Sequence, residues 1–284
     1  MKFRAALAQI DSRVGDVKHN LDRHLEFIER ARKEKANLVL FPELSLTGYT
    51  LRDIAWEVAL DPNMSPVIEK IKRQSRELTI VLGFVESGSD HGIYNSAMVV
   101  EDGNVIHIHR KVYPPTYGMF EEGRYYSRGK SIRAFDSRLG RFGIVICEDS
   151  WHAGLAYVLA ADGAEVMMAL SASPTRLGSN SDQMANADIN HEHHRSYARL
   201  LSLYYLFCNR VGFEDGVNFW GGSSVTDPTG SVQAMARYFD EDLIVSDLHE
   251  DNVRRARRLS RHVLDDDLLL IKREVERISK TPAS

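Results

Sequence analysis

The sequence predicts an α/β fold in which two mixed β-sheets are faced by helices. Short apolar strand-like segments recur along the whole chain and alternate with amphipathic helical segments. Asp102-Gly103 lies between two such strands and indicates a hairpin, so at least one sheet is mixed. No solenoid-length repeat or low-complexity linker divides the 284 residues. We therefore expect a single domain over residues 1–284, with a charged helical tail from about residue 251.

The first fifty residues predict a strand, a helix and a second strand. Residues 3–10 have the pattern of a strand. Residues 17–31 carry apolar side chains at helical spacing, and Asp16 before them is a suitable N-cap. Residues 37–41 are a short apolar run typical of a buried strand. This order indicates a βαβ unit whose sheet is covered by the helix.

The middle of the chain predicts two helices, three strands and a long loop. The helices are expected at 51–59 and 65–77, and the strands at 79–84, 95–100 and 105–109. Residues 110–130 lack periodicity and are rich in aromatic, glycine, proline and charged residues. Long loops without regular structure are usually functional in compact domains, so we expect this loop to line the active site.

The second half repeats this style. An apolar strand at 142–147 ends abruptly at Glu148-Asp149, and ligand sites in such sheets lie beyond the carboxyl ends of strands. The other predicted elements are helices at 154–161 and 182–203 and strands at 165–170, 204–210, 222–227, 231–236 and 243–248. The tail carries an apolar stripe that is suited to packing on its own domain or on a partner subunit: Leu264, Leu268, Ile271, Val275 and Ile278.

Charge and composition exclude several classes of protein. A net charge of -4 and a pI near 6.3 argue against nucleic acid or an anionic membrane as the main partner. No apolar run is long enough to span a bilayer, and the first residues do not resemble a signal peptide. Two cysteines exclude a disulfide framework, so we expect a soluble cytoplasmic enzyme. The basic run 254–258 is interpreted as one face of a surface helix.

Three side chains with catalytic potential stand at the ends of predicted strands. Cys147 ends the strand 142–147, Glu43 follows the strand 37–41, and Lys111 follows the strand 105–109. Each has an ordinary explanation by itself, respectively a small core residue, a capping or surface carboxylate and a solvated lysine. Together they offer a thiol nucleophile, a general base and an ammonium for a developing oxyanion.

These residues lie in motifs that resemble a known family. Phe41-Pro42-Glu43, His109-Arg110-Lys111-Val112 and Ile146-Cys147-Glu148-Asp149 are similar to the three signature regions of the nitrilase superfamily of carbon–nitrogen hydrolases. Their order and separations match, and the similarity continues through Gly221-Gly222-Ser223-Ser224. The resemblance implies a four-layer αββα sandwich, with Glu43 as general base and Cys147 as nucleophile. It also implies that Lys111 and the backbone N–H of Glu148 stabilise the tetrahedral intermediate.

The resemblance implies a fourth catalytic residue and no cofactor. Family members often carry a glutamate in this loop, before an aromatic pair and a glycine. In this chain the aromatic pair is Tyr125-Tyr126 and the glycine is Gly129. That places the role on Glu122, with Glu121 as the alternative assignment. The chemistry requires neither a metal nor an organic cofactor. His191-Glu192-His193-His194 is interpreted as a solvated helix face rather than a metal site, and Cys208 as a core residue.

The loop 113–126, with Cys147–Trp151 and Ser171–Pro174, is similar to the glutaminase domain of glutamine-dependent NAD synthetases. This similarity implies that the substrate pocket is lined by Tyr117, Glu148, Trp151 and Ser173. Two departures matter. The chain ends soon after the hydrolase domain, so we expect no ATP-using domain. The family's basic residue after Ser-Pro is replaced by Gly178-Ser179, which deprives a substrate α-carboxylate of a partner unless Arg176 supplies one.

We therefore expect a free-standing amidase that acts on a small aliphatic or glutamine-like amide and releases ammonia. The hydrolase alternatives are an N-carbamoyl amidohydrolase and a nitrilase. Three other readings stay open: an ammonia-supplying glutaminase subunit for a separate synthetase, acyl transfer to an acceptor other than water, and a binding protein with an idle site. The resemblance also implies a homo-oligomer, a dimer or higher.

Overall fold

The computed structural model describes residues 2–175 and 184–280, which form two six-stranded sheets and a small hairpin sheet. The first sheet has the strand order β14 (Asp242–His249), β1 (Lys2–Gln9), β2 (Leu38–Leu40), β3 (Thr79–Ser87), β4 (Ile93–Glu101) and β5 (Asn104–Arg110). The second has the order β13 (Val232–Met235), β12 (Ser224–Thr226), β9 (Tyr204–Asn209), β8 (Val166–Ser171), β7 (Gly140–Ile146) and β6 (Phe135–Ser137). The hairpin consists of β10 (Val211–Glu214) and β11 (Val217–Trp220).

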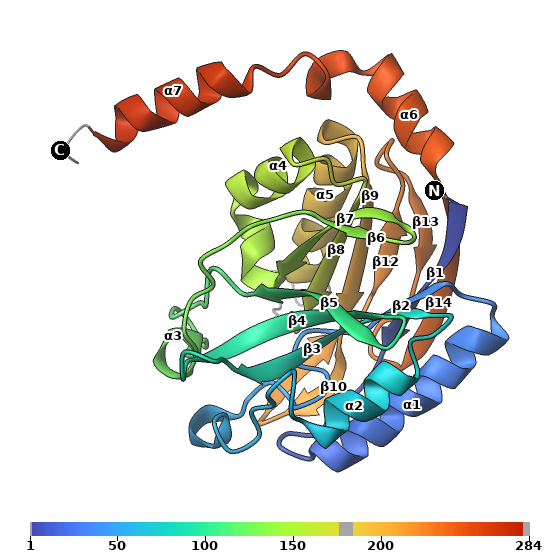
Figure 1. The fold of residues 1–284 in the computed structure, drawn as a ribbon, viewed down its shortest axis with the longest axis vertical. Coiled ribbons are helices and arrows are strands. Elements are labelled where there is room, and N and C mark those ends of the chain that lie inside the picture. The colour runs from blue at the N-terminus through green and yellow to red at the C-terminus, as the bar shows by residue number, and fades with distance from the viewer. Residues whose placement is uncertain (1, 176–183, 281–284) are drawn as a thin grey trace.

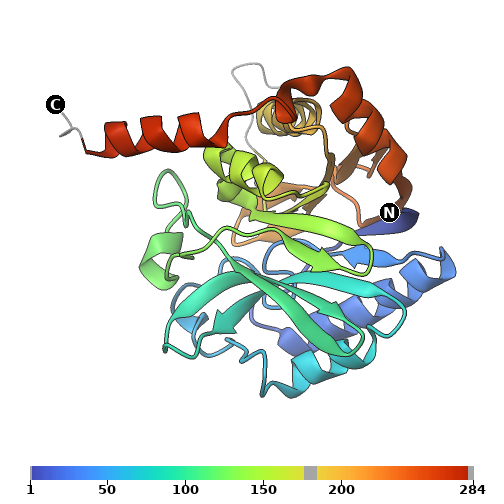
Figure 2. The same cartoon turned by 45° about the horizontal axis from the view of Figure 1, so that its top comes forward.

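The two large sheets pack face to face, and helices cover their outer faces (Figures 1 and 2). The helices α1 (Val17–Lys33) and α2 (Pro66–Arg73) cover the first sheet. The helices α4 (Ala153–Ala161) and α5 (Ala185–Leu200) cover the second. The predicted four-layer αββα sandwich is therefore confirmed.

The alternation of side chains along each strand explains this layering. In β1, Ala5 and Leu7 face the second sheet, whereas Ala6 and Ala8 face the helical layer. Successive side chains of a strand point to opposite faces of its sheet, and here both faces are covered. Most central positions of these strands are therefore apolar on both faces, which is why the sequence shows nearly continuous apolar runs.

Strand direction brings several strand ends to one edge. β1, β2 and β3 run parallel, and so do β7, β8 and β9. β4 is antiparallel to both β3 and β5, so β5 runs in the direction of β2. The carboxyl ends of β2 and β5 consequently lie at the same edge of the first sheet. The predicted Asp102-Gly103 turn joins β4 to β5, with positive φ values of 49° and 78°.

Two helix predictions were wrong or incomplete, and one hairpin was missed. The helix expected at 51–59 is only a single 3₁₀ turn, η1 (Arg52–Ile54), because Arg52 adopts a left-handed φ of 48°. The β10–β11 hairpin was missed, although its Asp215-Gly216 turn is a hairpin signal like the one recognised earlier. The helix expected at 65–77 is shorter and ends at Arg73.

The C-terminal tail is helical as predicted. It comprises α6 (Glu250–Leu259), the 3₁₀ turn η3 (Arg261–Val263) and α7 (Leu268–Ser279). The basic run lies on α6 at the surface. α7 projects away from the sandwich (Figures 1 and 2), and its apolar stripe is exposed, with Val275 and Ile278 at 59% and 60%. No helix of the described chain is long and apolar enough to cross a membrane.

Candidate active site

Cys147 directly follows β7 and begins the short 3₁₀ helix η2 (Cys147–Trp151). Its φ is +45°, a left-handed conformation that non-glycine residues rarely adopt. Such backbone strain clusters at functional sites. The side chain is partly exposed and lines a cavity, so the thiol stands at the edge of the sheet as the sequence predicted.

Glu43 follows β2 and is almost completely buried, with 1% exposure. Its Oε2 accepts a hydrogen bond from the backbone N–H of Ala172, 2.8 Å away, just beyond the end of β8. The loop that carries Glu43 passes directly over Gly83 of β3, where a Cβ would lie only 2.4 Å from the backbone N of Leu44. A glycine is therefore required at position 83 for this carboxylate to reach the site.

Lys111 follows β5 and is 1% exposed. Its Nζ donates to Glu43 Oε1 at 2.7 Å and to Glu122 Oε1 at 2.8 Å. An ammonium buried without anionic partners would be very costly, so the two carboxylates fix its position. The structure thus brings together the base, the lysine and the loop glutamate named from the sequence.

Glu122 begins the short helix α3 (Glu122–Tyr125) inside the predicted active-site loop. It is 5% exposed, whereas its neighbour Glu121 is at the surface. Besides Lys111, Glu122 Oε1 accepts a hydrogen bond from the Tyr49 hydroxyl at 2.6 Å. The geometry therefore favours Glu122 over Glu121 as the buried member of the cluster.

Two members of this cluster were missed in the sequence. Tyr49 is one. The other is Asn95 of β4, whose Nδ2 donates to Glu43 Oε1 at 2.7 Å and lies 3.4 Å from Glu122 Oε2. Asn95 thus lies between the two carboxylates and reduces their mutual repulsion. A polar residue within an apolar strand was the available signal.

Burial and charge together set the protonation states. Burial and the adjacent carboxylate of Glu43 raise the pKa of the Cys147 thiol, and Lys111 only partly opposes them. Burial also raises the pKa of Glu122 despite the ammonium of Lys111. For Lys111, burial lowers the pKa, but Glu122 and Glu43 outweigh it and raise it well above the ordinary value. At neutral pH the resting site therefore holds a protonated thiol beside a charged ammonium.

All four residues predicted to bind substrate line the cavity at Cys147. It measures about 150 Å³, and its lining includes Tyr117, Phe120, Cys147, Glu148, Trp151, Ser173, Pro174 and Asn186. The Tyr117 hydroxyl donates to Glu148 Oε2 at 2.8 Å. Ser173 Oγ accepts hydrogen bonds from Asn186 Nδ2 at 3.0 Å and from Trp220 Nε1 at 3.2 Å. Asn186 and Trp220 were not identified from the sequence.

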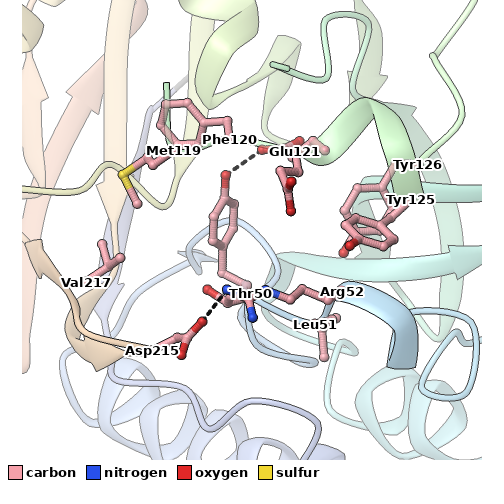
Figure 3. Close-up of a pocket in the computed structure, with 12 residues that line it drawn as sticks. Thr50, Leu51, Arg52, Met119, Phe120, Glu121, Tyr125, Tyr126, Asp215 and Val217 are labelled. Atoms are coloured by element: carbon pink, nitrogen blue, oxygen red, sulfur yellow. Dashed lines mark hydrogen bonds and ion pairs between the residues drawn. The ribbon is translucent and has the colours of Figure 1, made fainter. Parts of the chain in front are cut away.

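A second cavity, of about 200 Å³, shares Phe120 with the Cys147 cavity in its lining and reaches Glu122. In Figure 3 it opens between the loop that carries Met119 and Phe120 and the β10–β11 hairpin with Asp215 and Val217. Arg52 donates to Asp215 at 2.6 Å at its rim. Glu122 is therefore flanked by a cavity that does not contain Cys147.

The expectation for the histidine cluster was partly wrong. His194 is buried and stacks on Tyr205, with ring centroids 4.7 Å apart, because α5 packs this face on the second sheet. His191 is half-buried and contacts Trp220 edge-on. His194 is therefore a core residue and His191 packs against aromatic side chains, so these two histidines are not a solvated face. Among the described residues, no group of three His, Cys, Asp or Glu side chains is arranged to hold a metal ion.

The second cysteine and the segment after Pro174 were also considered in the sequence. Cys208 is fully buried between the sheets, as predicted, and its thiol lies 3.2 Å from the carbonyl oxygen of Leu40. Arg176, Gly178 and Ser179 lie outside the described residues.

Comparisons with known proteins agree on one family. The sequence profile of the family described as carbon-nitrogen hydrolase matches residues 4–258. A glutamine-dependent NAD(+) synthetase of Acinetobacter baylyi is 31% identical over 245 residues, which are 86% of this chain but 44% of that protein. The chain thus spans less than half the length of the curated relatives it matches.

Solved structures give the same result for the fold. A glutamine-dependent NAD+ synthetase of Acinetobacter baumannii superposes with a TM-score of 0.79 at 30% identity, over 89% of this chain and 47% of that chain. A carbon-nitrogen hydrolase of Helicobacter pylori superposes with a TM-score of 0.83 over 94% of this chain and 96% of that one. The identity in the second case is 23%, so that likeness concerns the fold alone.

Proposed function

Because the chain belongs to the carbon–nitrogen hydrolase family of the nitrilase superfamily, we propose that it hydrolyses a small aliphatic or glutamine-like amide through a thioester on Cys147 and releases ammonia. One observation carries this proposal. Lys111 is held between Glu43 and Glu122 inside the same charge cluster as Cys147, and the thiol lines a cavity of small-molecule size.

The first half of the reaction forms the thioester. Glu43 removes the proton of the Cys147 thiol as Sγ attacks the amide carbon, so the raised pKa of the thiol is overcome only when substrate is present. Lys111 and the backbone N–H of Glu148 stabilise the oxyanion of the tetrahedral intermediate. The C–N bond then breaks, the leaving nitrogen takes the proton from Glu43, and ammonia departs.

Water completes the reaction. Glu43 accepts a proton from the water that attacks the thioester carbon, the C–S bond breaks, and the proton returns to the sulfur. Glu122 keeps the Lys111 ammonium in place through both halves, and the donors Tyr49 and Asn95 fix the two carboxylates. All proton transfers thus pass through one carboxylate.

The charge of the cavity supports a substrate with an amino group. Apart from the catalytic cluster, Glu148 is the charged side chain that lines the described part of the Cys147 cavity. Tyr117 fixes one of its oxygens, and His152 lies 3.9 Å from the other. A substrate ammonium near Glu148 would form a charge-assisted hydrogen bond. This favours a glutamine-like amide over a purely aliphatic one.

A specific observation supports a second candidate function. The relatives named glutamine-dependent NAD(+) synthetase are more than twice as long as the matched region. In the second candidate, the chain supplies ammonia to a separate synthetase and is weakly active alone. Its activity would then rise when a purified synthetase partner is added, whereas a free-standing amidase would be indifferent.

Ammonia release provides the test. Glutamine, small aliphatic amides, N-carbamoyl compounds and nitriles are compared with the wild type, Cys147→Ala and the matched control Cys208→Ala. We expect release from amides, a fall of at least about 1000-fold in Cys147→Ala, and little change in Cys208→Ala. Equal release by the wild type and Cys147→Ala would contradict the thiol mechanism.

The exposed stripe of α7 supports a homo-oligomer. Leu268, Ile271, Val275 and Ile278 recur at intervals of three and four residues and therefore lie on one face of the helix. Apolar side chains exposed along one helix face favour burial against a partner. We propose that the whole chain is one hydrolase domain and that a second copy covers this face.

A further inference from the structure

Asp149 joins the two segments that carry Cys147 and Lys111. It lies in η2, two residues after Cys147, and its side chain is completely buried. Nevertheless it is not part of the charge cluster around Lys111. Its two oxygens accept four hydrogen bonds. Three of the donors belong to the first sheet, on strand β5 and in the loop that follows it.

The donors surround Lys111 in the sequence. Oδ1 accepts from the backbone N–H groups of Val112 and Tyr113, both at 3.0 Å. Oδ2 accepts from His109 Nε2 at 3.1 Å. The lysine is thus held from both sides, because its neighbours before and after are tied to the same carboxylate. A carboxylate that accepts several N–H bonds in a buried setting makes strong, directional contacts.

The fourth hydrogen bond reaches back to the nucleophile. Oδ2 also accepts from the backbone N–H of Ile146, 3.2 Å away, the residue before Cys147. This bond closes the left-handed turn in which Cys147 has its φ of +45°. One side chain therefore fixes both the strained turn of the thiol and the position of the lysine loop.

We infer that Asp149, with His109, is a positioning residue that sets the distance and orientation between Cys147 and Lys111. This inference rests on the proposed function only in calling those two residues catalytic. Strands β5 and β7 belong to different sheets, so their ends are not paired by a backbone ladder. The Asp149 carboxylate supplies the missing connection, and displacements near 1 Å at a catalytic site cost about 100-fold in rate.

The chain offers a matched control at the opposite end of the sandwich. Glu101 is also a buried carboxylate that joins the two sheets, since it accepts hydrogen bonds from Thr79 of β3, Ser137 of β6 and the backbone of Arg138. It ends β4, six residues and therefore about 20 Å from Asn95 in the active site. Glu101→Gln weakens a contact of the same kind between the sheets, but at a distance from the active site.

The test compares Asp149→Asn, His109→Leu, His109→Gln and Glu101→Gln in the full chain. Glutamine at position 109 keeps an N–H donor near the place of Nε2, whereas leucine removes it. Folding is checked by circular dichroism and thermal unfolding. Two readouts follow: kcat and KM for the best amide, and the pH dependence of Cys147 alkylation by iodoacetamide, located by peptide mass spectrometry.

We expect Asp149→Asn to lower kcat at least about 100-fold and His109→Leu about 10-fold, with KM changed less than about threefold. In the alkylation experiment, the loosened turn admits water and moves Cys147 away from Glu43, so the pH midpoint falls toward that of an ordinary thiol even though Lys111 also withdraws. His109→Gln and Glu101→Gln should keep the wild-type profile, whatever their thermal stability. If Asp149→Asn does not fold, the His109 pair carries the test alone.

The inference is overturned if folded Asp149→Asn or His109→Leu keeps both the wild-type alkylation profile and kcat, or if Glu101→Gln reproduces their effects. Alkylation needs no substrate. A shifted profile together with a wild type that is inactive on every amide would therefore refute the proposed function and leave the positioning role intact.

Discussion

At the scale of single residues, the site is a problem of charge balance in a buried space. The carboxylates of Glu43 and Glu122 pack against the ammonium of Lys111. All three charges influence the pKa of the Cys147 thiol. Buried charges are tolerated when they are paired and hydrogen-bonded. The Tyr49 hydroxyl adds a hydrogen bond to Glu122 Oε1, and Asn95 Nδ2 adds one to Glu43 Oε1. These are the two oxygens that Lys111 also contacts. This arrangement makes the residues interdependent.

The two adjacent loop glutamates provide a sharp test at this scale. Glu122→Gln replaces a buried partner of Lys111, so we expect kcat for amide hydrolysis to fall about 100-fold. Glu121→Gln changes an exposed side chain and should leave kcat within about twofold. Steady-state kinetics of both variants decide the matter. A larger effect for Glu121→Gln would reverse the assignment.

His24 predicts a pH dependence of stability. It is buried in α1, where Nδ1 donates to the carbonyl oxygen of Asn20 and Nε2 accepts from the Ser45 hydroxyl in the loop after Glu43. Burial lowers its pKa from 6.5 to about 4. Between these values the unfolded chain binds the proton and the folded chain does not, so stability falls as the pH decreases from 6.5 to 4. The loss is about 3 kcal/mol when complete.

Urea unfolding at several pH values between 4 and 7 measures this effect. His24→Gln should flatten the dependence by up to one proton, and the exposed His262→Gln serves as the matched control. An unchanged slope in His24→Gln would contradict the prediction.

At the scale of elements, strand direction explains how distant parts of the sequence meet. β2 and β5 end at the same edge of the first sheet, and β7 ends against them from the second sheet. The loop before α3 then adds Glu122. Glu43, Lys111 and Cys147 therefore lie at or just after the ends of rigid strands, where side chains are positioned more precisely than in free loops.

α7 is the element whose role is open to the simplest test. Ile271→Glu combined with Val275→Glu places charges on the exposed stripe, so we expect a lower molar mass by light scattering after size-exclusion chromatography. Arg273→Gln combined with Arg277→Gln changes another face of the helix and should keep the wild-type mass. A wild type that is already monomeric would refute contact through α7.

At the scale of the whole molecule, the packing of the two sheets gives the two cysteines different exposure to solvent. Cys147 is partly exposed at the edge, whereas Cys208 lies in the core between the sheets. Under native conditions we expect iodoacetamide to modify Cys147 and leave Cys208 intact, because access to Cys208 requires the sheets to part. Mass spectrometry with increasing urea should show Cys208 reacting only through the global unfolding transition. Earlier reaction of Cys208 would indicate that the sheets separate locally.

Much of the fold and of the site followed from local patterns. The strand around Leu38 to Leu40, the helix after Asp16 and the Asp102-Gly103 turn were predicted because their signals are contained in neighbouring residues. The prediction of a helix at 51–59 was wrong because Arg52 has a left-handed φ, and nothing in the neighbouring residues indicates that conformation. The histidines of α5 were misjudged, since polar residues are buried when an aromatic surface is available to them.

The sequence by itself determined the layered α/β class, the family and the residues with reactive groups, because apolar periodicity and short motifs are local properties. Only the tertiary structure decided which of those groups meet. Glu43 and Lys111 are 68 positions apart, and Asn95 joins them from a third strand. Likewise the choice of Glu122 over Glu121 and the four contacts of Asp149 depend on the packing of two sheets. Distances between strand ends are set by that packing, and no local pattern encodes them.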